Sequence, residues 1–355
     1  MKNLRLSRAS LLSAILVGSW RRLPPPPVGI SEAQLDAATP LLYSSGSAAL
    51  GWWRVRQTNL SSTPSAKMLH QAYRVQALRS AIHEEKIEKI FRLLRQASVD
   101  AILVKGWLAA ALYPDRALRP YGDIDLCFRR EHFHTAKNIL ASSEAKDCWV
   151  DPHVRFSELE SRSFEELFAR SQLVDLGIEK IRVMGPEDHL ALLAIHLLKH
   201  GAWRPLWLCD IGAAIESLPQ EFSWDICLGG NKTRALWVIC AIHLAHELLD
   251  ADIDSLPKPY RLRKLPRWLV SNVLRQWASP VAINQPPMSH PAPMASYLKS
   301  PRGLLKGLRA RWPNPIIATV SVNGEFNGFP RLPYQLGNCA LRTAEFLFHR
   351  SNTLG

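Results

Sequence analysis

Residues 103–126 read LVKGWLAAALYPDRALRPYGDIDL, and this stretch determines the fold that we predict for the chain. It begins inside a short apolar run, Ala101–Val104, which is typical of a buried strand. A helix-length apolar piece and then a loop with two prolines follow the run. The segment Asp123–Phe128 has the alternation of a second strand.

The same alternation of strand-like and helix-like segments continues on both sides of this stretch. Before it, apolar residues at helical spacing over Lys67–Ser98 predict one long helix or two abutting helices. After it we expect, in order, a helix, a strand, a helix and a strand: Arg130–Ser142, Cys148–Phe156, Ser163–Arg170 and Ile181–Val183. Strands that alternate with helices over residues 98–184 indicate an α/β unit.

The chain after this unit is predicted to be helical. Pro186 and the two acidic residues that follow it are typical of a first helical turn, and that helix should run to about His200. Further helices are expected at about 207–217, 231–250, 261–278 and 335–349. Ten prolines within residues 279–334 indicate loops or an extended wrap.

The expected fold is therefore α+β, with a small α/β core and a mostly helical second domain. The predicted boundaries give an N-terminal helical or irregular segment, the core, the helical domain, and a Pro/Arg-rich wrap with a C-terminal helix: 1–65, 66–184, 185–278 and 279–355. A chain of 355 residues suits two or three units. Its 47% apolar and 21% charged residues exclude a wholly disordered chain or a fibrous rod.

The charge balance is strongly basic. Lys and Arg number 44 against 31 Asp and Glu, and the net charge of +13 suits a polyanionic partner such as a nucleoside triphosphate, nucleic acid or an anionic membrane. Residues 255–312 hold many of the cations, and we expect them to attract a polyphosphate or an anionic partner. No helix-turn-helix, zinc-finger or RNA-recognition signature accompanies them, so nucleic acid is not the expected partner.

Cysteine usage and hydropathy indicate a cytoplasmic protein. Six cysteines without a C-x-x-C pair argue against a disulfide scaffold or a cysteine zinc site and fit a reducing compartment. The apolar run Leu11–Trp20 imitates a short signal peptide, but its large residues fit a helical stripe and no convincing cleavage site follows. No other segment reaches about 18 uncharged apolar residues, so we expect no membrane span.

Paired aspartates carry the strongest chemical signal. If Asp123–Phe128 is a strand, its period of two puts Asp123 and Asp125 on one face. Neighbouring carboxylates repel each other unless a cation lies between them, so a divalent metal held by oxygen ligands is one reading, and an exposed strand end without a metal is the other. Upstream, Lys105 and Gly106 end a strand and open a helix, an arrangement that offers backbone N–H groups to a phosphate.

A third carboxylate is expected on a neighbouring strand. In Cys148–Phe156 the alternation puts Asp151, His153 and Arg155 on one face. Pro152 has no N–H to donate to a ladder, so this strand should be an edge strand or a bulged one.

Together these motifs resemble the bacterial uncharacterised nucleotidyltransferase family of the DNA-polymerase-β-like superfamily. The resemblance covers about residues 98–215 and rests on the following pieces: Lys105-Gly106, Leu112-Tyr113-Pro114, Leu118-Arg119-Pro120, Gly122-Asp-Ile-Asp-Leu126, Asp151-x-His153, Pro186-Glu-Asp-His-Leu190 and His196-Leu-Leu-Lys-His200-Gly201.

The resemblance implies a small mixed sheet, two Mg²⁺ ions and an NTP co-substrate whose α-phosphorus is attacked with release of pyrophosphate. It implies that Asp123, Asp125 and Asp151 are the catalytic, metal-binding carboxylates. The Gly-Ser pair usual in the superfamily is Lys105-Gly106 here, so the phosphates lack a serine contact. We infer that Lys105 or Arg119 supplies a cation to them, with Gly106 close by.

Histidines form a row on the predicted helix that starts at Pro186. His189, His196 and His200 lie near one face, where they can pack and hydrogen-bond locally, bind a metal or contact substrate. We keep His153, His196 and His200 as candidate residues of a substrate cleft. Asp210 precedes a helical pattern and is expected to cap that helix at its N-terminus, with a cleft-facing contact as the alternative.

The leading functional hypothesis is a Mg²⁺-dependent nucleotidyltransferase that moves an NMP from an NTP to a hydroxyl or phosphate of a small-molecule, peptide or protein acceptor. Some members of the similar family accompany peptide natural-product gene clusters, so natural-product biosynthesis is one setting. The alternative is a non-catalytic nucleotide- or RNA-binding module on a degenerate fold. Transfer of the γ-phosphoryl group is a third possibility, since the same metal clamp serves it.

Overall fold

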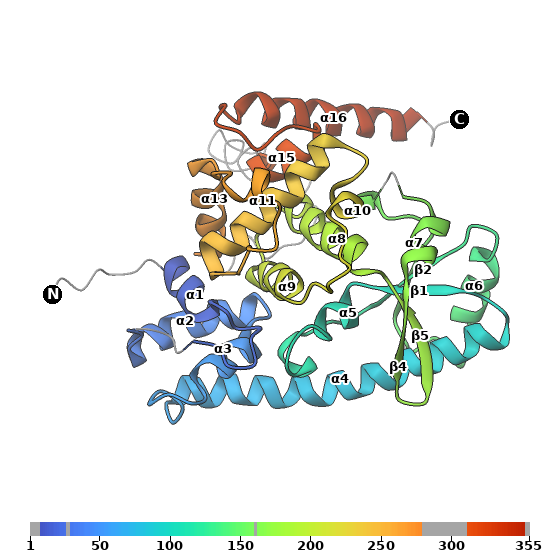
Figure 1. Cartoon of the computed structure of the whole chain (residues 1–355), viewed down its shortest axis with the longest axis horizontal. Coiled ribbons are helices and arrows are strands. Elements are labelled where there is room, and N and C mark those ends of the chain that lie inside the picture. The colour runs from blue at the N-terminus through green and yellow to red at the C-terminus, as the bar shows by residue number, and fades with distance from the viewer. Residues whose placement is uncertain (1–7, 26–28, 160–161, 279–310, 352–355) are drawn as a thin grey trace, which may run out of the picture.

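The computed structural model describes residues 8–25, 29–159, 162–278 and 311–351 (Figure 1). Three short helices come first: α1 (Arg8–Leu16), α2 (Glu32–Ser44) and α3 (Ala48–Val55). The large side chains of α1 are buried in the main core, which confirms the helical stripe expected there. This segment packs against the later helices, since the Gly18 amide donates to the Leu249 carbonyl and Arg21 pairs with Glu216.

The segment that was predicted to form one long helix or two abutting helices is one continuous helix, α4 (Pro64–Gln96). It starts with a good N-terminal signal, because the Thr63 side chain accepts a hydrogen bond from the Ala66 amide and proline occupies the first turn. Figure 1 shows α4 running along one edge of the molecule, from beneath α3 to beneath the sheet.

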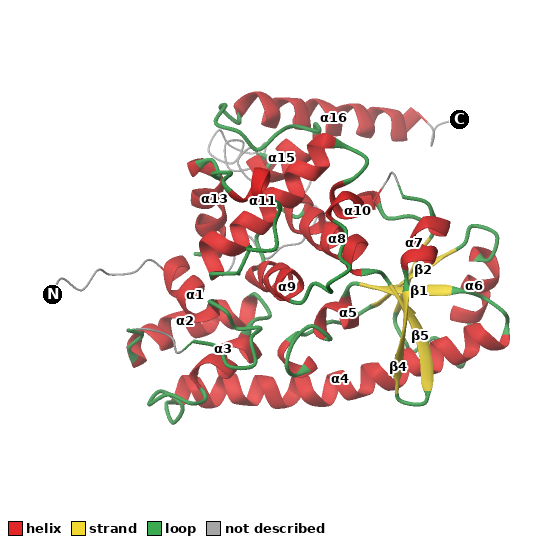
Figure 2. Cartoon of the chain, in the orientation of Figure 1, coloured by secondary structure: helices red, strands yellow, loops and turns green. Residues whose placement is uncertain are grey.

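The sheet has five strands in the order β3-β2-β1-β5-β4 (Figure 2). Their bounds are Ala101–Val104 (β1), Ile124–Phe128 (β2), Val150–His153 (β3), Gln172–Leu176 (β4) and Glu179–Val183 (β5). Pairings β1–β2 and β4–β5 are antiparallel, whereas β1–β5 and β2–β3 are parallel. The sheet is therefore mixed, and β3 with its Pro152 is an edge strand, both as predicted.

Strand β4 was not anticipated from the sequence. It forms a hairpin with β5 through Gly177, whose φ of +57° lies in the left-handed region that glycine tolerates. Its first four residues are exposed or half-buried, so it lacks the apolar signal of an internal strand.

Short helices connect the strands. They are α5 (Gly106–Ala110), α6 (Phe133–Leu140), α7 (Phe164–Arg170) and the 3₁₀ turns η1 (Arg116–Leu118) and η2 (Ser157–Leu159). The predicted α/β unit is thus present, with shorter helices than the sequence pattern indicated.

The rest of the described chain is helical. Its helices are α8 (Pro186–Lys199), α9 (Pro205–Glu216), α10 (Trp224–Leu228), α11 (Lys232–Leu249), α12 (Lys258–Arg261), α13 (Arg267–Trp277), α15 (Pro315–Ser321) and α16 (Leu332–Ser351). The helix expected at 261–278 is shorter than predicted, because α13 begins only at Arg267, directly after Pro266, and the separate short helix α12 ends at Arg261. Most of the predicted 279–334 wrap, residues 279–310, lies outside the described residues, and α15 occupies part of the remainder.

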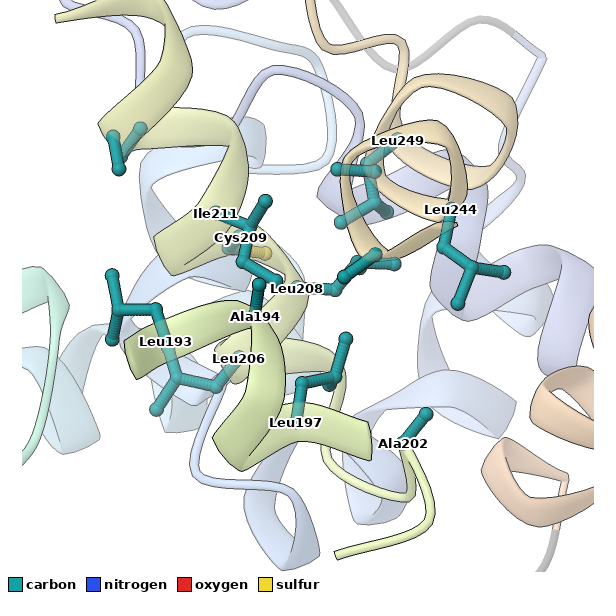
Figure 3. Packing of buried hydrophobic residues seen from close by; sticks show 14 of the residues in the cluster. Leu193, Ala194, Leu197, Ala202, Leu206, Leu208, Cys209, Ile211, Leu244 and Leu249 are labelled. Atoms are coloured by element: carbon teal, nitrogen blue, oxygen red, sulfur yellow. The ribbon is translucent and has the colours of Figure 1, made fainter. Parts of the chain in front are cut away.

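Two hydrophobic cores lie on opposite faces of the sheet. Side chains such as Leu103, Leu126 and Phe128 pack toward the C-terminal half of α4 and toward α6. Ile102 and Cys127, on the other face, join the large core of the helical region. Figure 3 shows the interior of that core, where α8, α9 and α11 meet. Because Asp125 alternates with Leu126 along β2, its side chain belongs to the face that is turned toward the helical region.

A buried ion pair joins the loop before β2 to α9. Arg119 donates to both carboxylate oxygens of Asp210, at 2.8 and 3.2 Å, and the Tyr113 hydroxyl donates to the same carboxylate at 2.8 Å. The Asp210 side chain has no exposed area. The expectation that Asp210 caps a helix was wrong, because α9 begins at Pro205 and Arg204 is its N-cap residue.

The domain boundaries inferred from the sequence stay predictions. Side chains of the N-terminal helices and of the helical region lie in one hydrophobic core. Among the described residues, no helix is long and apolar enough to cross a membrane.

We expect Asp210→Ala to lower the free energy of unfolding by about 3–5 kcal/mol, because the buried Arg119 charge loses its partner. Urea denaturation followed by circular dichroism measures the change. Asp175→Ala, which removes an exposed partner 3.8 Å from Lys180, is the matched control and should cost less than about 1 kcal/mol. Similar costs for the two variants would contradict a structural role for the buried pair.

Candidate functional site

Strands β2 and β3 bring two carboxylates and an imidazole together. The parallel register sets Asp125 opposite Asp151 and Cys127 opposite His153. His153 lies between the two aspartates, with its Nε2 at 3.1 Å from Asp125 Oδ1 and at 3.1 Å from Asp151 Oδ2. The expectation that Asp151 shares a face with His153 on a strand next to β2 is therefore confirmed.

Lys105 completes a charged cluster around the buried carboxylate. Its Nζ donates to Asp125 Oδ1 at 3.1 Å. Burial raises the pKa of Asp125. The hydrogen bond from His153 and the charge of Lys105 lower this pKa by more than burial raises it, so it lies below the usual value. Asp125 is thus held as a carboxylate, with the Lys105 ammonium and the His153 imidazole as its close partners.

The cluster has the composition of a cation site. One ligand atom each from Asp125, Asp151 and His153 lie within 4.8 Å of one another. Two carboxylates and a neutral imidazole suit a divalent cation, with oxygen ligands favouring Mg²⁺ or Mn²⁺ and the imidazole admitting a softer metal. Without a cation, the contacts from Lys105 Nζ and His153 Nε2 to Asp125 Oδ1 stabilise the charge of this carboxylate.

Asp123 lies outside this group of three. It precedes β2, it is exposed, and its charge acts on His83 and on Arg204. The prediction that Asp123 and Asp125 share one face of a strand was wrong for Asp123, because β2 begins at Ile124 and only Asp125 is in the group. The catalytic role of Asp123 stays a prediction.

The turn between β1 and α5 is conformationally unusual. Lys105 has φ +48° and Gly106 has φ +26°, so two consecutive residues adopt a left-handed backbone. A non-glycine residue in this region costs free energy, and such geometry is concentrated at ligand sites. The turn also aims the Lys105 side chain at Asp125 and over the Phe156 ring, with Nζ 5.4 Å from the ring centroid.

A second wall of the site comes from η2, α8 and α9. His196 and His200 are in ring contact, with centroids 4.4 Å apart, and both rings contact Trp207 of α9. His196 Nδ1 lies 3.4 Å from Glu158 Oε1. The charge of Lys105 contributes to lowering the pKa of both Glu158 and His200, so His196 and His200 lie near the group formed by Asp125, Asp151 and His153.

The charges of this wall are set by burial and by close partners. Burial raises the pKa of Glu158, but the His196 hydrogen bond and the charges of Lys199 and Lys105 lower it more, to well below its usual value. Burial, helped by the neighbouring His196, lowers the pKa of His200 to about 4. The wall therefore presents a carboxylate beside a neutral aromatic surface at pH 7.

The three histidines of α8 do not act as one set. His196 and His200 line the second wall, whereas His189 is buried near Asp210 and Arg119. Arg119 lies in the buried ion pair with Asp210, and its predicted phosphate contact would require that pair to open. Among the residues that the sequence singled out, the structure brings together Lys105, Asp125, Asp151 and His153, with His196 and His200 nearby.

Sequence reasoning missed Glu158, Trp207 and Arg204. Arg204 donates to the Ser45 carbonyl and lies over the Trp207 ring, and burial lowers its pKa to about 10. Its charge interacts with that of Asp123. None of the three stands in a recognisable sequence motif. Glu158 lies on η2, and Arg204 and Trp207 lie at the start of α9, so only tertiary packing brings them near His196 and His200.

The family comparison agrees with this geometry. A family described as uncharacterised nucleotidyltransferase matches residues 31–147 and 142–250 of the chain. Neither a curated protein nor a solved structure is detectably similar to it.

Acid should destabilise the protein through His189. Burial lowers the pKa of His189 to about 4, and its Nε2 has no hydrogen-bond partner among the described residues. The unfolded state, with a His pKa of about 6.5, binds more protons between pH 6.5 and 4, so stability is full above that window and falls as pH falls through it. We expect His189→Leu to reduce the stability lost between pH 7 and 5 by about 2 kcal/mol, as measured by urea denaturation at both pH values.

His134→Leu is the matched control, because His134 is exposed on α6. Equal losses of stability on acidification in the wild type and in His189→Leu would show that His189 does not carry this pH dependence.

Proposed function

The chain belongs to the uncharacterised nucleotidyltransferase family, and we propose that it transfers a nucleoside monophosphate from an NTP to an acceptor hydroxyl or phosphate, with release of pyrophosphate. The observation that carries the proposal is the register that sets Asp125 opposite Asp151, with His153 between their carboxylates and Lys105 at 3.1 Å from Asp125. The six free cysteines fit the reducing cytoplasm that we propose as the place of activity.

Asp125 and Asp151, with His153, are the residues that we propose to hold a Mg²⁺ ion, and Asp123 with Asp125 would serve a second one. The ligand atoms of the first group fit such an ion, since they lie within 4.8 Å of one another and two of the three residues are carboxylates. Bound cations there would neutralise triphosphate charge and polarise the α-phosphorus.

Lys105 and Gly106 are the proposed phosphate contacts. The Lys105 ammonium lies 3.1 Å from Asp125 Oδ1, so a cation held by Asp125 would compete with it and leave it available to a phosphate oxygen. Glycine at 106 leaves the backbone open to close approach, because it carries no side chain. Arg119 is not needed in this arrangement.

The second wall suits the recognition of nucleotide or acceptor. A neutral His200 ring beside His196 and Trp207 offers an aromatic surface on which a base can stack. Glu158, held ionised beside His196, can accept a hydrogen bond from an acceptor hydroxyl. We propose a small molecule, a peptide or a protein as the acceptor, and natural-product biosynthesis as one setting.

A non-catalytic nucleotide- or RNA-binding module would not need Asp151. An aspartate opposite Asp125, sharing one imidazole with it, favours chemistry over simple binding, because a lone binding site for a polyanion has no use for two converging carboxylates.

We expect Asp125→Asn and Asp151→Asn each to lower NTP-dependent pyrophosphate release by about 100-fold or more, because each removes negative charge that the cation needs. The measurement is transfer of label from each α-³²P-labelled NTP, with Mg²⁺, in a lysate that supplies acceptors, because the α-phosphorus stays with the transferred nucleotide while the pyrophosphate leaves unlabelled. The labelled product identifies the acceptor, and ADP in place of AMP-linked product would identify γ-phosphoryl transfer instead.

Asp175→Asn, on the β4–β5 hairpin, is the matched control and should keep full activity. Wild-type turnover by Asp125→Asn, with its fold intact, would refute the assignment of the site.

A further inference from the structure

Arg204 is a cation that uncharged groups hold in place. Its Nε donates to the Ser45 carbonyl at 2.9 Å, and its guanidinium carbon lies 5.6 Å from the centroid of the Trp207 ring. Gly46 makes this position accessible, because a Cβ at residue 46 would clash with Arg204 Nη2. A backbone carbonyl, a glycine and an aromatic ring thus fix the guanidinium, and none of them carries a negative charge.

The nearby Arg119 has a counter-charge, whereas Arg204 has none. Arg119 donates to both oxygens of Asp210, and Tyr113 donates to the same carboxylate, so the oxygens of Asp210 are already occupied. In the described part of the chain, no carboxylate lies within ion-pair distance of Arg204. The Arg204 guanidinium therefore keeps its charge and N–H donors for another anion.

Arg204 lies near both walls of the candidate site. Trp207, on which its guanidinium lies, contacts the rings of His196 and His200. The charge of Asp123, which directly precedes β2, acts on Arg204. Burial and the charge of Arg119 lower the pKa of Arg204 to about 10, so it stays a cation at neutral pH in a partly dehydrated place. Attraction between this cation and an anion is stronger there than in bulk water.

We propose that Arg204 binds the polyphosphate of the NTP, as a second cation beside Lys105. A triphosphate carries several negative charges, and the planar guanidinium can donate two parallel N–H bonds to one phosphate. This inference rests on the proposed function, because it assigns a ligand contact within the same site. It also changes which arginine serves the phosphates, since Arg119 is engaged with Asp210.

Calorimetric titration of the full chain with inorganic pyrophosphate and Mg²⁺ tests the proposal without requiring turnover. We expect Arg204→Gln to raise the Kd for pyrophosphate about 10- to 100-fold, because one charge-assisted contact is lost. Arg204→Lys keeps the charge but not the planar fork, so its Kd should lie between those of the wild type and Arg204→Gln. Arg56→Gln is the matched control, because Arg56 also lies over a tryptophan ring, at the end of α3, and it should bind as the wild type does.

Gly46→Ala tests the same contact from the loop that precedes α3. The new Cβ would displace the Arg204 guanidinium, so we expect weaker pyrophosphate binding in the wild-type background and no further weakening in Arg204→Gln. Thermal unfolding by circular dichroism checks that each variant is folded.

Kinetics give a second readout. Arg204→Gln should raise the KM for the NTP while kcat stays within several-fold of the wild type, because a contact made equally in the ground state and the transition state affects binding and not the chemical step.

The outcomes separate this inference from the proposed function. Failure of the wild type to bind pyrophosphate, an unchanged Kd in Arg204→Gln and in Gly46→Ala, or equal weakening by Arg56→Gln would each overturn the role of Arg204 and leave label transfer to be judged by itself. Pyrophosphate binding that depends on Arg204, in a wild type that transfers label from no NTP, would support the contact and refute the proposed function.

Discussion

The buried pair between Arg119 and Asp210 is the constraint on which the arrangement of the site depends. Neither side chain has appreciable exposure, and a buried charge without its partner costs several kcal/mol, so the loop before β2 must lie against α9. Tyr113 adds a hydrogen bond from the start of the same loop. One wall of the site is built on the strand that follows this loop, and the other wall includes α9, so the pair sets the distance between them.

The mixed sheet turns this constraint into a chemical site. The parallel register of β2 and β3 pairs Asp125 with Asp151, and paired residues direct their side chains to the same face of the sheet. The two carboxylates therefore meet on the face that is turned toward the helical region. The antiparallel pairing of β1 with β2 brings the turn at Lys105 beside Asp125. The carboxylates of Asp125 and Asp151 are therefore brought together where the Lys105 ammonium and the His153 imidazole can offset their repulsion.

The histidines of α8 show how one helix face divides between two environments. His189 precedes His196 and His200 by about two and three helical turns, and it lies in the interior beside the buried ion pair, where the neutral ring is favoured. His196 and His200 emerge where α8 passes η2 and α9, and there they meet Glu158 and Trp207. Helical spacing alone gives all three the same direction, whereas depth along the helix decides what each one contacts.

The sequence by itself determined the class of fold, most element positions and half of the site. The period of two identified β2 and β3, and the apolar spacing identified α4, α8 and α11, because a buried face must repeat with the period of its own backbone. Strand alternation, which is a local property, paired Asp123 with Asp125 and put Asp151, His153 and Arg155 on one face, and the family resemblance added Lys105. Strand β4 escaped because an exposed hairpin strand lacks an apolar signal, and Asp210 was misassigned because its partner is 91 residues away. Only the tertiary structure decided that Arg119 is internal, that Asp123 is not one of the three grouped residues, and that Glu158 and Trp207 lie against His196. Those facts depend on which helices pack against the sheet, and packing is settled by the whole core and not by any one segment.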